Sequence, residues 1–175
     1  MNFIIAIDTC AIIHLMYIKR FDFLIKLGYS VITTIYVQLE FEKGYSSSRD
    51  YFLNLLKTKE ISLYTLEIDD LVEMANVPQS KKASDAELSC FVLAKRIATK
   101  AMTDDKKAIN YIQKHINLSK NSVITLVDVL FEAYLNSWLS DDDLKYIKST
   151  LSDNKFHIKE DLAFEFARRR WMMKT

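Results

Sequence analysis

The stretch FIIAIDTCA, residues 3–11, carries a run of apolar side chains directly into Asp8. A short apolar run of this kind predicts a strand that is buried on both faces, as in a parallel sheet. In open α/β folds, ligands bind beyond the carboxyl ends of such strands. Asp8 is therefore expected either to cap the helix that follows it or to belong to a functional site. Other carboxylates at the same edge of the sheet would favour the second interpretation.

The composition is that of one soluble globular domain. Half of the 175 residues are hydrophobic and 27% are charged, and only two glycines and one proline are present, which argues against a flexible interdomain linker. A net charge of +1 neither favours nor excludes nucleic acid as a partner. Cys10 and Cys90 lie in apolar segments and are expected to be buried free thiols, and the three histidines lack a paired metal-ligand spacing. Because no leader or membrane span is recognisable, we predict a cytoplasmic protein.

Strand and helix patterns alternate along most of the chain. Strands are expected over residues 3–7, 29–34, 61–66, 101–103 and 122–124, and helices over residues 9–16, 19–27, 35–43, 51–56, 69–75, 84–97, 106–115, 126–138, 141–151 and 161–171. Gly44 is the expected end of the helix over residues 35–43. The alternation predicts an α/β fold with a mainly parallel central sheet and helices on both faces.

Four acidic residues occupy related places in this pattern. Asp8 and Asp104 end strands, Asp85 lies in the first turn of a long helix, and Glu40 lies on the helix after the second strand. Strand ends and helix starts share one edge of a parallel sheet, so three of the four are expected to converge there, and Glu40 could lean towards them. Carboxylates this close raise one another's pKa unless a cation neutralises them. Oxygen ligands suit Mg²⁺ or Mn²⁺, which favours phosphodiester hydrolysis.

The individual residues also have structural interpretations. Glu87 follows a serine with the spacing of a capping box, which favours a structural rather than a catalytic role for it. Either Asp104 or Asp105 could cap the next helix. Glu42 lies two residues from Glu40 and therefore on a different face of its helix, so only one of this pair can point inwards. The ordered set, rather than any single member, is the specific signal.

This ordered set resembles the PIN domain, a nuclease family that includes the VapC toxins of toxin–antitoxin pairs. The segment IDTC around Asp8 resembles the first family motif, and ITTIYVQLEFEKG resembles the second, with Glu40 four residues before Gly44. SDAELSCFVLAKR resembles the third motif and places its acidic residue at Asp85. AMTDDKKA resembles the fourth motif and places Asp104 at the metal-site position.

The resemblance covers residues 3–137 and implies a three-layer PIN-like domain at residues 1–137. It also implies a helical extension at residues 138–175 packed on that domain, since residues 144–170 are similar to a longer PIN subgroup with extra C-terminal helices. The implied partners are an RNA substrate, an antitoxin protein and a second copy of the chain, with no membrane.

The resemblance further implies an Mg²⁺- or Mn²⁺-dependent endoribonuclease and a role for each site residue. The metal would be held by Asp8, Asp85 and Asp104, while Glu40 would bind or position it or orient the attacking water. Three neighbouring side chains would support these carboxylates, namely Thr9, Thr103 and Asp105. Many toxins carry a neutral residue at the position of Asp105, which is a departure from the family pattern.

Two other functional classes stay open. A catalytically silent PIN-like protein would bind nucleic acid or a partner without cutting it, although all four acidic positions are filled. A phosphatase-type phosphotransfer enzyme of the haloacid dehalogenase class would need an aspartate two residues after Asp8, where this chain has Cys10. A receiver-like module would need its phosphorylated aspartate at the end of a central strand, whereas Glu40 is expected on a helix.

Several other charged residues have two interpretations each. Some lysines near the proposed edge could contact phosphates or be solvated side chains, namely Lys81, Lys82, Lys106 and Lys107. The basic run 168–170 suits the last turn of a terminal helix, where the helix dipole favours cations, or a phosphate contact. Asp128 follows Thr125 with capping-box spacing but could also face the site.

Overall fold

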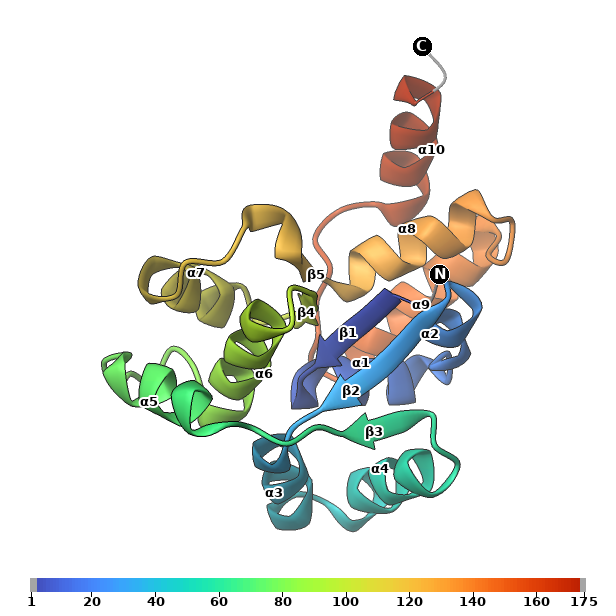
Figure 1. Ribbon diagram of the computed structural model, residues 1–175. Coiled ribbons are helices and arrows are strands. Elements are labelled where there is room, and N and C mark those ends of the chain that lie inside the picture. Colours follow the sequence, from blue (N-terminus) through green and yellow to red (C-terminus); the bar gives the residue numbers. More distant parts are fainter. Residues whose placement is uncertain (1–2, 174–175) are drawn as a thin grey trace.

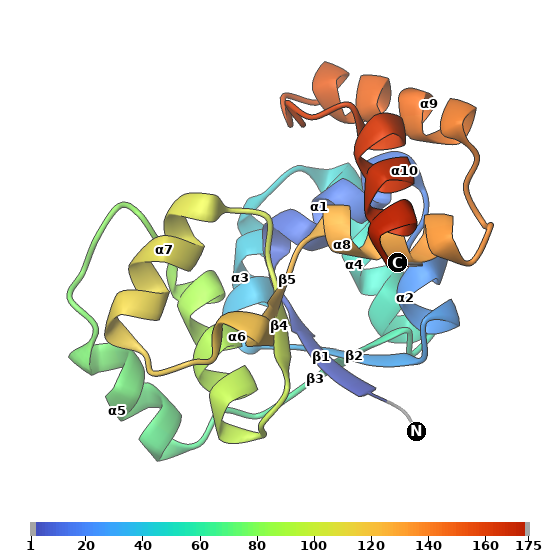
Figure 2. The same cartoon turned by 90° about the horizontal axis from the view of Figure 1, so that it is seen from above.

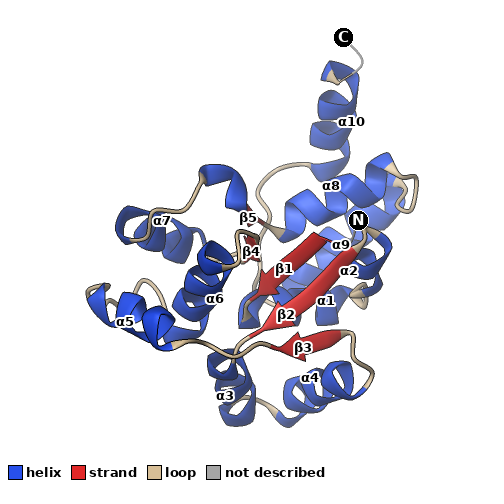
Figure 3. Cartoon of the chain, in the orientation of Figure 1, coloured by secondary structure: helices blue, strands red, loops and turns tan. Residues whose placement is uncertain are grey.

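A computed structural model describes residues 3–173, and the strands within them form one sheet (Figures 1 and 3). The strands are β1 (Phe3–Ile7), β2 (Tyr29–Thr33), β3 (Ile61–Leu63), β4 (Lys100–Met102) and β5 (Val123–Ile124). Their order in the sheet is β3-β2-β1-β4-β5, and every neighbouring pair is parallel. The predicted α/β fold is therefore confirmed, and the described sheet is parallel throughout.

Ten α-helices lie within residues 3–173. They are α1 (Thr9–Ile18), α2 (Asp22–Lys26), α3 (Ile35–Lys43), α4 (Ser46–Lys57), α5 (Ile68–Asn76), α6 (Asp85–Arg96), α7 (Lys106–His115), α8 (Leu126–Leu135), α9 (Asp141–Asp153) and α10 (Leu162–Met172), with a short 3-10 helix η1 (Lys120–Ser122) before β5. Helices α5, α6 and α7 cover one face of the sheet, while α1, α2, α4 and α8 lie on the other (Figure 2). No helix in this part of the chain is long and apolar enough to cross a lipid bilayer.

The strand order creates a switch point beside β1. The chain moves from β1 through β2 to β3, and then returns to place β4 and β5 on the other side of β1. Ile7 pairs with Met102, so the residues just beyond the sheet, Asp8 and Thr103, face the crevice between the two strand ends. The backbone N–H of Asp8 donates to the carbonyl of Met102 at 3.1 Å and continues the pairing. Ligands of open α/β sheets bind at such a point.

Strand β1 is buried only in its second half. Ile5, Ala6 and Ile7 are fully buried, whereas Phe3 and Ile4 are 59% and 40% exposed. The prediction of a strand buried on both faces was therefore wrong for its first two residues. The pairing with β4 begins only at Ile5, so the start of β1 extends beyond its neighbour on that side.

Element boundaries differ from the predicted ones where local turns intervene. The helix predicted over residues 19–27 is reduced to α2, because Lys19 adopts a left-handed conformation that ends α1. The helix predicted over residues 51–56 begins earlier as α4, since the serine-rich segment forms its first turn. Gly44 ends α3 as predicted, with an extended backbone at φ −85°.

The last helices pack onto the same body. Helix α9 contacts α1, and α10 contacts both α8 and α9. Of the basic run at the end of α10, Arg168 and Arg169 bind Glu165 one turn earlier, at 2.8 and 2.9 Å. These contacts agree with the interpretation of this run as part of a terminal helix.

A largely buried ion pair fastens α5 to α6. Asp70 is 2% exposed, and the Nε of Arg96 donates to both of its carboxylate oxygens at 2.9 and 2.8 Å. The same guanidinium donates to Glu67 at 2.7 Å and to the carbonyl of Thr65 at 3.1 Å. The C-terminal end of helix α6 is therefore fixed by this ion pair, while its first turn reaches the carboxyl edge of the sheet.

Removal of this pair should destabilise the protein. We expect Asp70→Ala to lower the free energy of unfolding by about 3 kcal/mol, because Arg96 loses its buried partner and the capping box at the start of α5 is lost as well. Asp142→Ala removes an exposed pair with Lys145 and should cause no measurable change. Urea titration followed by circular dichroism measures both variants. Equal midpoints for Asp70→Ala and Asp142→Ala would show that the buried pair has no special role.

Candidate metal centre

Asp8 caps α1 and is also one of the acidic residues expected to form a metal site at the end of β1. It is 1% exposed, and its carboxylate accepts the backbone N–H of Ala11 at 2.9 Å, which caps α1. The thiol of Cys10 donates to the same carboxylate, 3.2 Å from each oxygen. Burial raises the pKa of Asp8 to about 7, although hydrogen bonds, that of Thr103 foremost, partly oppose this effect, and the charge of Glu87 raises the pKa further.

Buried hydroxyl groups hold the backbone around Asp8. The carbonyl of Ile7 accepts the hydroxyl of Thr33 at 2.8 Å and the thiol of Cys90 at 3.4 Å. Thr34 and Ser89, both fully buried, share a hydrogen bond of 2.7 Å between the start of α3 and helix α6. The elements that carry the acidic residues are thus tied together at the end of β1.

The start of α6 brings Glu87 to Asp8. Ligand atoms of Asp8, Cys10 and Glu87 all lie within 4.8 Å of one another, whereas Asp85 is exposed and lines a neighbouring cavity. Glu87 also accepts the backbone N–H of Ser84 at 2.8 Å, so the predicted capping box is present. The predicted capping role of Glu87 is therefore confirmed, and the same carboxylate also approaches Asp8. Burial raises its pKa, and the charges of two other carboxylates add to the effect.

Glu40 reaches the same region from α3. The hydroxyl of Thr9 donates to its carboxylate at 2.6 Å, which links α3 to the first turn of α1. The charge of Glu40 contributes to the raised pKa of Glu87. Glu42 instead accepts the side-chain amide of Gln38 at 2.9 Å, in an exposed contact within the helix. The two glutamates therefore have different surroundings, and Glu40 is the one near the centre.

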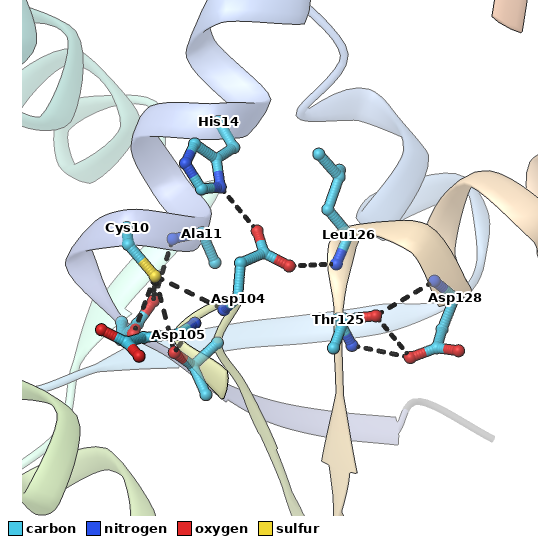
Figure 4. A network of polar contacts seen from close by, with 10 residues as sticks. Cys10, Ala11, His14, Asp104, Asp105, Thr125, Leu126 and Asp128 are labelled. Carbon is cyan, nitrogen blue, oxygen red and sulfur yellow. Dashed lines mark hydrogen bonds and ion pairs between the residues drawn. The ribbon is translucent and has the colours of Figure 1, made fainter. Parts of the chain in front are cut away.

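Asp104 is held from two sides (Figure 4). It is 8% exposed; one carboxylate oxygen accepts the backbone N–H of Leu126 at 2.7 Å, and the other lies 2.7 Å from Nδ1 of His14. The backbone N–H of Asp104 donates to the sulfur of Cys10 at 3.4 Å. Cys10 consequently lies between Asp8 and Asp104 and contacts both residues.

Asp105 and Asp128 serve as helix caps. Asp105 accepts the N–H groups of Lys107 and Ala108 at 2.7 and 3.1 Å at the start of α7. Asp128 accepts the backbone N–H and the hydroxyl of Thr125 at 2.8 and 2.7 Å (Figure 4). Asp128 also lines a cavity beside the first residues of β2 and β4, at the opposite end of the sheet from Asp8. The structure thus decides for the capping interpretation of Asp128.

Three residues of the centre had no functional place in the sequence-based prediction. Cys10 was expected to be a small buried thiol and His14 an isolated histidine, and Glu87 was assigned to a cap. Cys10 and Cys90 are both free thiols, but Cys10 is only partly buried. Cys10 and His14 are four residues apart, so they lie on one face of the helix that directly follows Asp8. This spacing is the sequence signal that could have placed them near the site.

The charge balance of the centre is strongly negative. Asp8 and Glu87 approach each other, the charges of Glu40 and Asp105 act on Glu87, and the charge of Asp104 acts on Cys10. Within residues 3–173, the ion pair between His14 and Asp104 is the one that involves any of these carboxylates. Because close carboxylates disfavour one another's ionisation, such a cluster suits a bound divalent cation.

The raised pKa of Asp8 predicts a pH-dependent stability. A carboxyl whose pKa is higher in the folded state stabilises the fold while protonated and loses this contribution as the pH rises. Without divalent cations, the free energy of unfolding should fall between about pH 4 and pH 7, by up to about 1.4 kcal/mol per pH unit. Urea unfolding in EDTA measures the slope, which should be smaller in Asp8→Asn. Identical slopes in the two proteins would contradict the assignment to Asp8.

Comparison with known proteins places the chain in a family. The sequence matches the PIN domain family DUF3368 over residues 4–170, which includes every carboxylate described above and extends into α10. A search of curated proteins found no match. Because the family match covers nearly the whole length, the chain belongs to the PIN domain family.

Proposed function

We propose that the protein is an endoribonuclease that depends on Mg²⁺ or Mn²⁺. The observation that carries the proposal is the approach of Asp8, Cys10 and Glu87 to within 4.8 Å at the switch point of a PIN fold. The buried carboxylate of Asp104 supports it, since Cys10 connects this residue to Asp8. Carboxylates gathered at the end of a central strand suit hydrolysis of a phosphodiester bond.

The donor set fits a hard divalent cation. Burial and the neighbouring carboxylates raise the pKa of the Cys10 thiol, so it stays protonated and donates to Asp8 rather than acting as a thiolate. Oxygen atoms are then the available ligands, as Mg²⁺ and Mn²⁺ prefer. Asp8 and Glu87 would hold the ion, and Glu40 and Asp104 would orient its water ligands. When bound, the ion would supply an activated water and stabilise charge on the phosphate.

A cavity beside the centre supports RNA as the substrate. It has a volume of about 860 Å³, and its lining includes Asp85, Lys81, Tyr36 and Tyr111. The hydroxyl of Tyr111 donates to the carbonyl of Pro78 and fixes one wall. Aromatic rings stack on unpaired bases, and a lysine at the rim can contact a phosphate. Unpaired RNA that passes this cavity would bring its backbone to the carboxylates.

A toxin role within a toxin–antitoxin pair would add a protein partner. Exposed apolar side chains on neighbouring helices α3 and α4 would provide the surface for an antitoxin or for a second copy of the chain. These side chains are Ile35, Leu39 and Leu53.

Neutralisation of Asp8 tests the proposed chemistry. Asp8→Asn keeps an acceptor for the cap of α1 but removes the charge, so we expect RNA cleavage to fall by at least about a hundredfold with an unchanged circular dichroism spectrum. The assay incubates total RNA with purified protein and Mg²⁺ or Mn²⁺, with EDTA as the control, and maps the cleaved ends. A folded Asp8→Asn protein that cleaves RNA at the original rate would refute the proposal.

The two acidic residues at the start of α6 can be separated by experiment. Glu87→Gln retains an acceptor for the capping box, and we expect it to weaken Mn²⁺ binding and to slow cleavage by about tenfold or more. Asp85→Asn is the matched control, and a smaller effect is expected because its side chain is exposed. Isothermal titration with Mn²⁺ measures the affinities. The reverse order of effects would assign the metal to Asp85.

A further inference from the structure

His14 joins the carboxylate centre to the C-terminal helices. Its Nδ1 lies 2.7 Å from Asp104, and its side chain is largely buried. An ionised carboxylate only accepts hydrogen bonds, so Nδ1 is the donor. The other oxygen of Asp104 accepts the N–H of Leu126 at the first residue of α8 (Figure 4). With a donor on each oxygen, the orientation of the carboxylate is fixed.

A phenylalanine from the C-terminal part of the chain holds the imidazole in turn. The ring of Phe156 stacks on His14 with a centroid separation of 3.9 Å and an interplanar angle of 28°. Phe156 lies between α9 and α10, 142 positions after His14 in the sequence. Stacking restrains the imidazole plane, and the plane sets the direction in which Nδ1 donates.

The backbone around Phe156 is itself fixed. Lys155 adopts a left-handed conformation at φ 66°, and its N–H donates to the carbonyl of Ser152 at 3.0 Å. The N–H of Phe156 donates to the carbonyl of Leu151 at 2.9 Å, which completes a Schellman motif at the end of α9. Leu151 is fully buried, and α9 packs on α1, the helix that carries His14. The phenylalanine is therefore placed by packing of α9 and by this turn.

We propose that His14 is a positioning residue for Asp104. We further propose that Phe156, by stacking on His14, couples the C-terminal helices to the orientation of this carboxylate. This inference rests on the proposed nuclease function and deepens it. Each oxygen of Asp104 keeps a second lone pair after accepting its present donor. His14 and Leu126 thus orient the carboxylate without using up its capacity to accept from a metal-bound water. Partners of this kind typically affect metal affinity or activity by 10- to 100-fold.

Variants of both rings test the chain of contacts. His14→Ala removes the donor, whereas His14→Asn offers an amide N–H near the position of Nδ1 and should restore most of the function. Phe156→Ala removes the stacking ring. We expect His14→Ala to weaken Mn²⁺ binding and lower kcat by about tenfold, with an unchanged KM for RNA. Phe156→Ala should show a smaller loss in the same two quantities.

The double variant distinguishes positioning from a general loss of packing. If Phe156 acts through His14, then Phe156→Ala in the His14→Ala background should add little to the loss of Mn²⁺ affinity. Additive losses would overturn the proposed coupling. Phe164→Ala is a matched control on an exposed phenylalanine and should leave Mn²⁺ affinity unchanged. Should Phe156→Ala fail to fold, Phe156→Leu keeps apolar volume without the ring and repeats the test.

The outcomes separate this inference from the proposed function. Loss of Mn²⁺ binding in Asp8→Asn together with full affinity in His14→Ala would overturn the role of His14 and leave the nuclease proposal standing. Full Mn²⁺ affinity and RNA cleavage in both variants would refute the metal-dependent function itself. Electron paramagnetic resonance of free Mn²⁺ measures affinity independently of turnover.

Discussion

The pairing of β1 with β4 is the constraint on which the centre depends. It brings together two strand ends that are far apart in the sequence, and the N–H of Asp8 extends it by one hydrogen bond to Met102. Because the chain leaves β1 and β4 towards opposite faces of the sheet, the helices that follow do not fill the crevice between them. Asp8 and Asp104 can therefore lie at one place, approached by α3 and α6.

The carboxylates gathered near Asp8 lower the free energy of unfolding of the metal-free protein. Burial raises the pKa of Asp8 to about 7, and the pKa of Glu87 is raised as well. The protein limits this cost by giving the same carboxylates structural partners, since Asp8 caps α1 and Glu87 closes a capping box. A divalent cation would remove the remaining repulsion. The stability of the fold and the proposed function thus depend on the same side chains.

The C-terminal helices are connected to the centre through aromatic and polar contacts. Phe156 stacks on His14, and His14 contacts Asp104. Helix α8 reaches the same carboxylate directly through the N–H of Leu126. The family match extends into α10, which agrees with these helices being integral to the chain's PIN architecture. A carboxylate held from two elements, α1 and α8, has little freedom to turn, and such preorganisation suits the proposed metal site.

The sequence by itself determined the order of strands and helices along the chain and several helix caps, such as those that begin α6 and α8. Apolar runs such as FIIAI and pairs such as Thr125 with Asp128 are local signals, because they depend on contacts within one turn or one strand. Only the tertiary structure decided which carboxylate of α6 meets Asp8, since this depends on the rotation of the helix over the sheet. The contact of His14 with Asp104 spans 90 positions, and no local periodicity encodes such a distance.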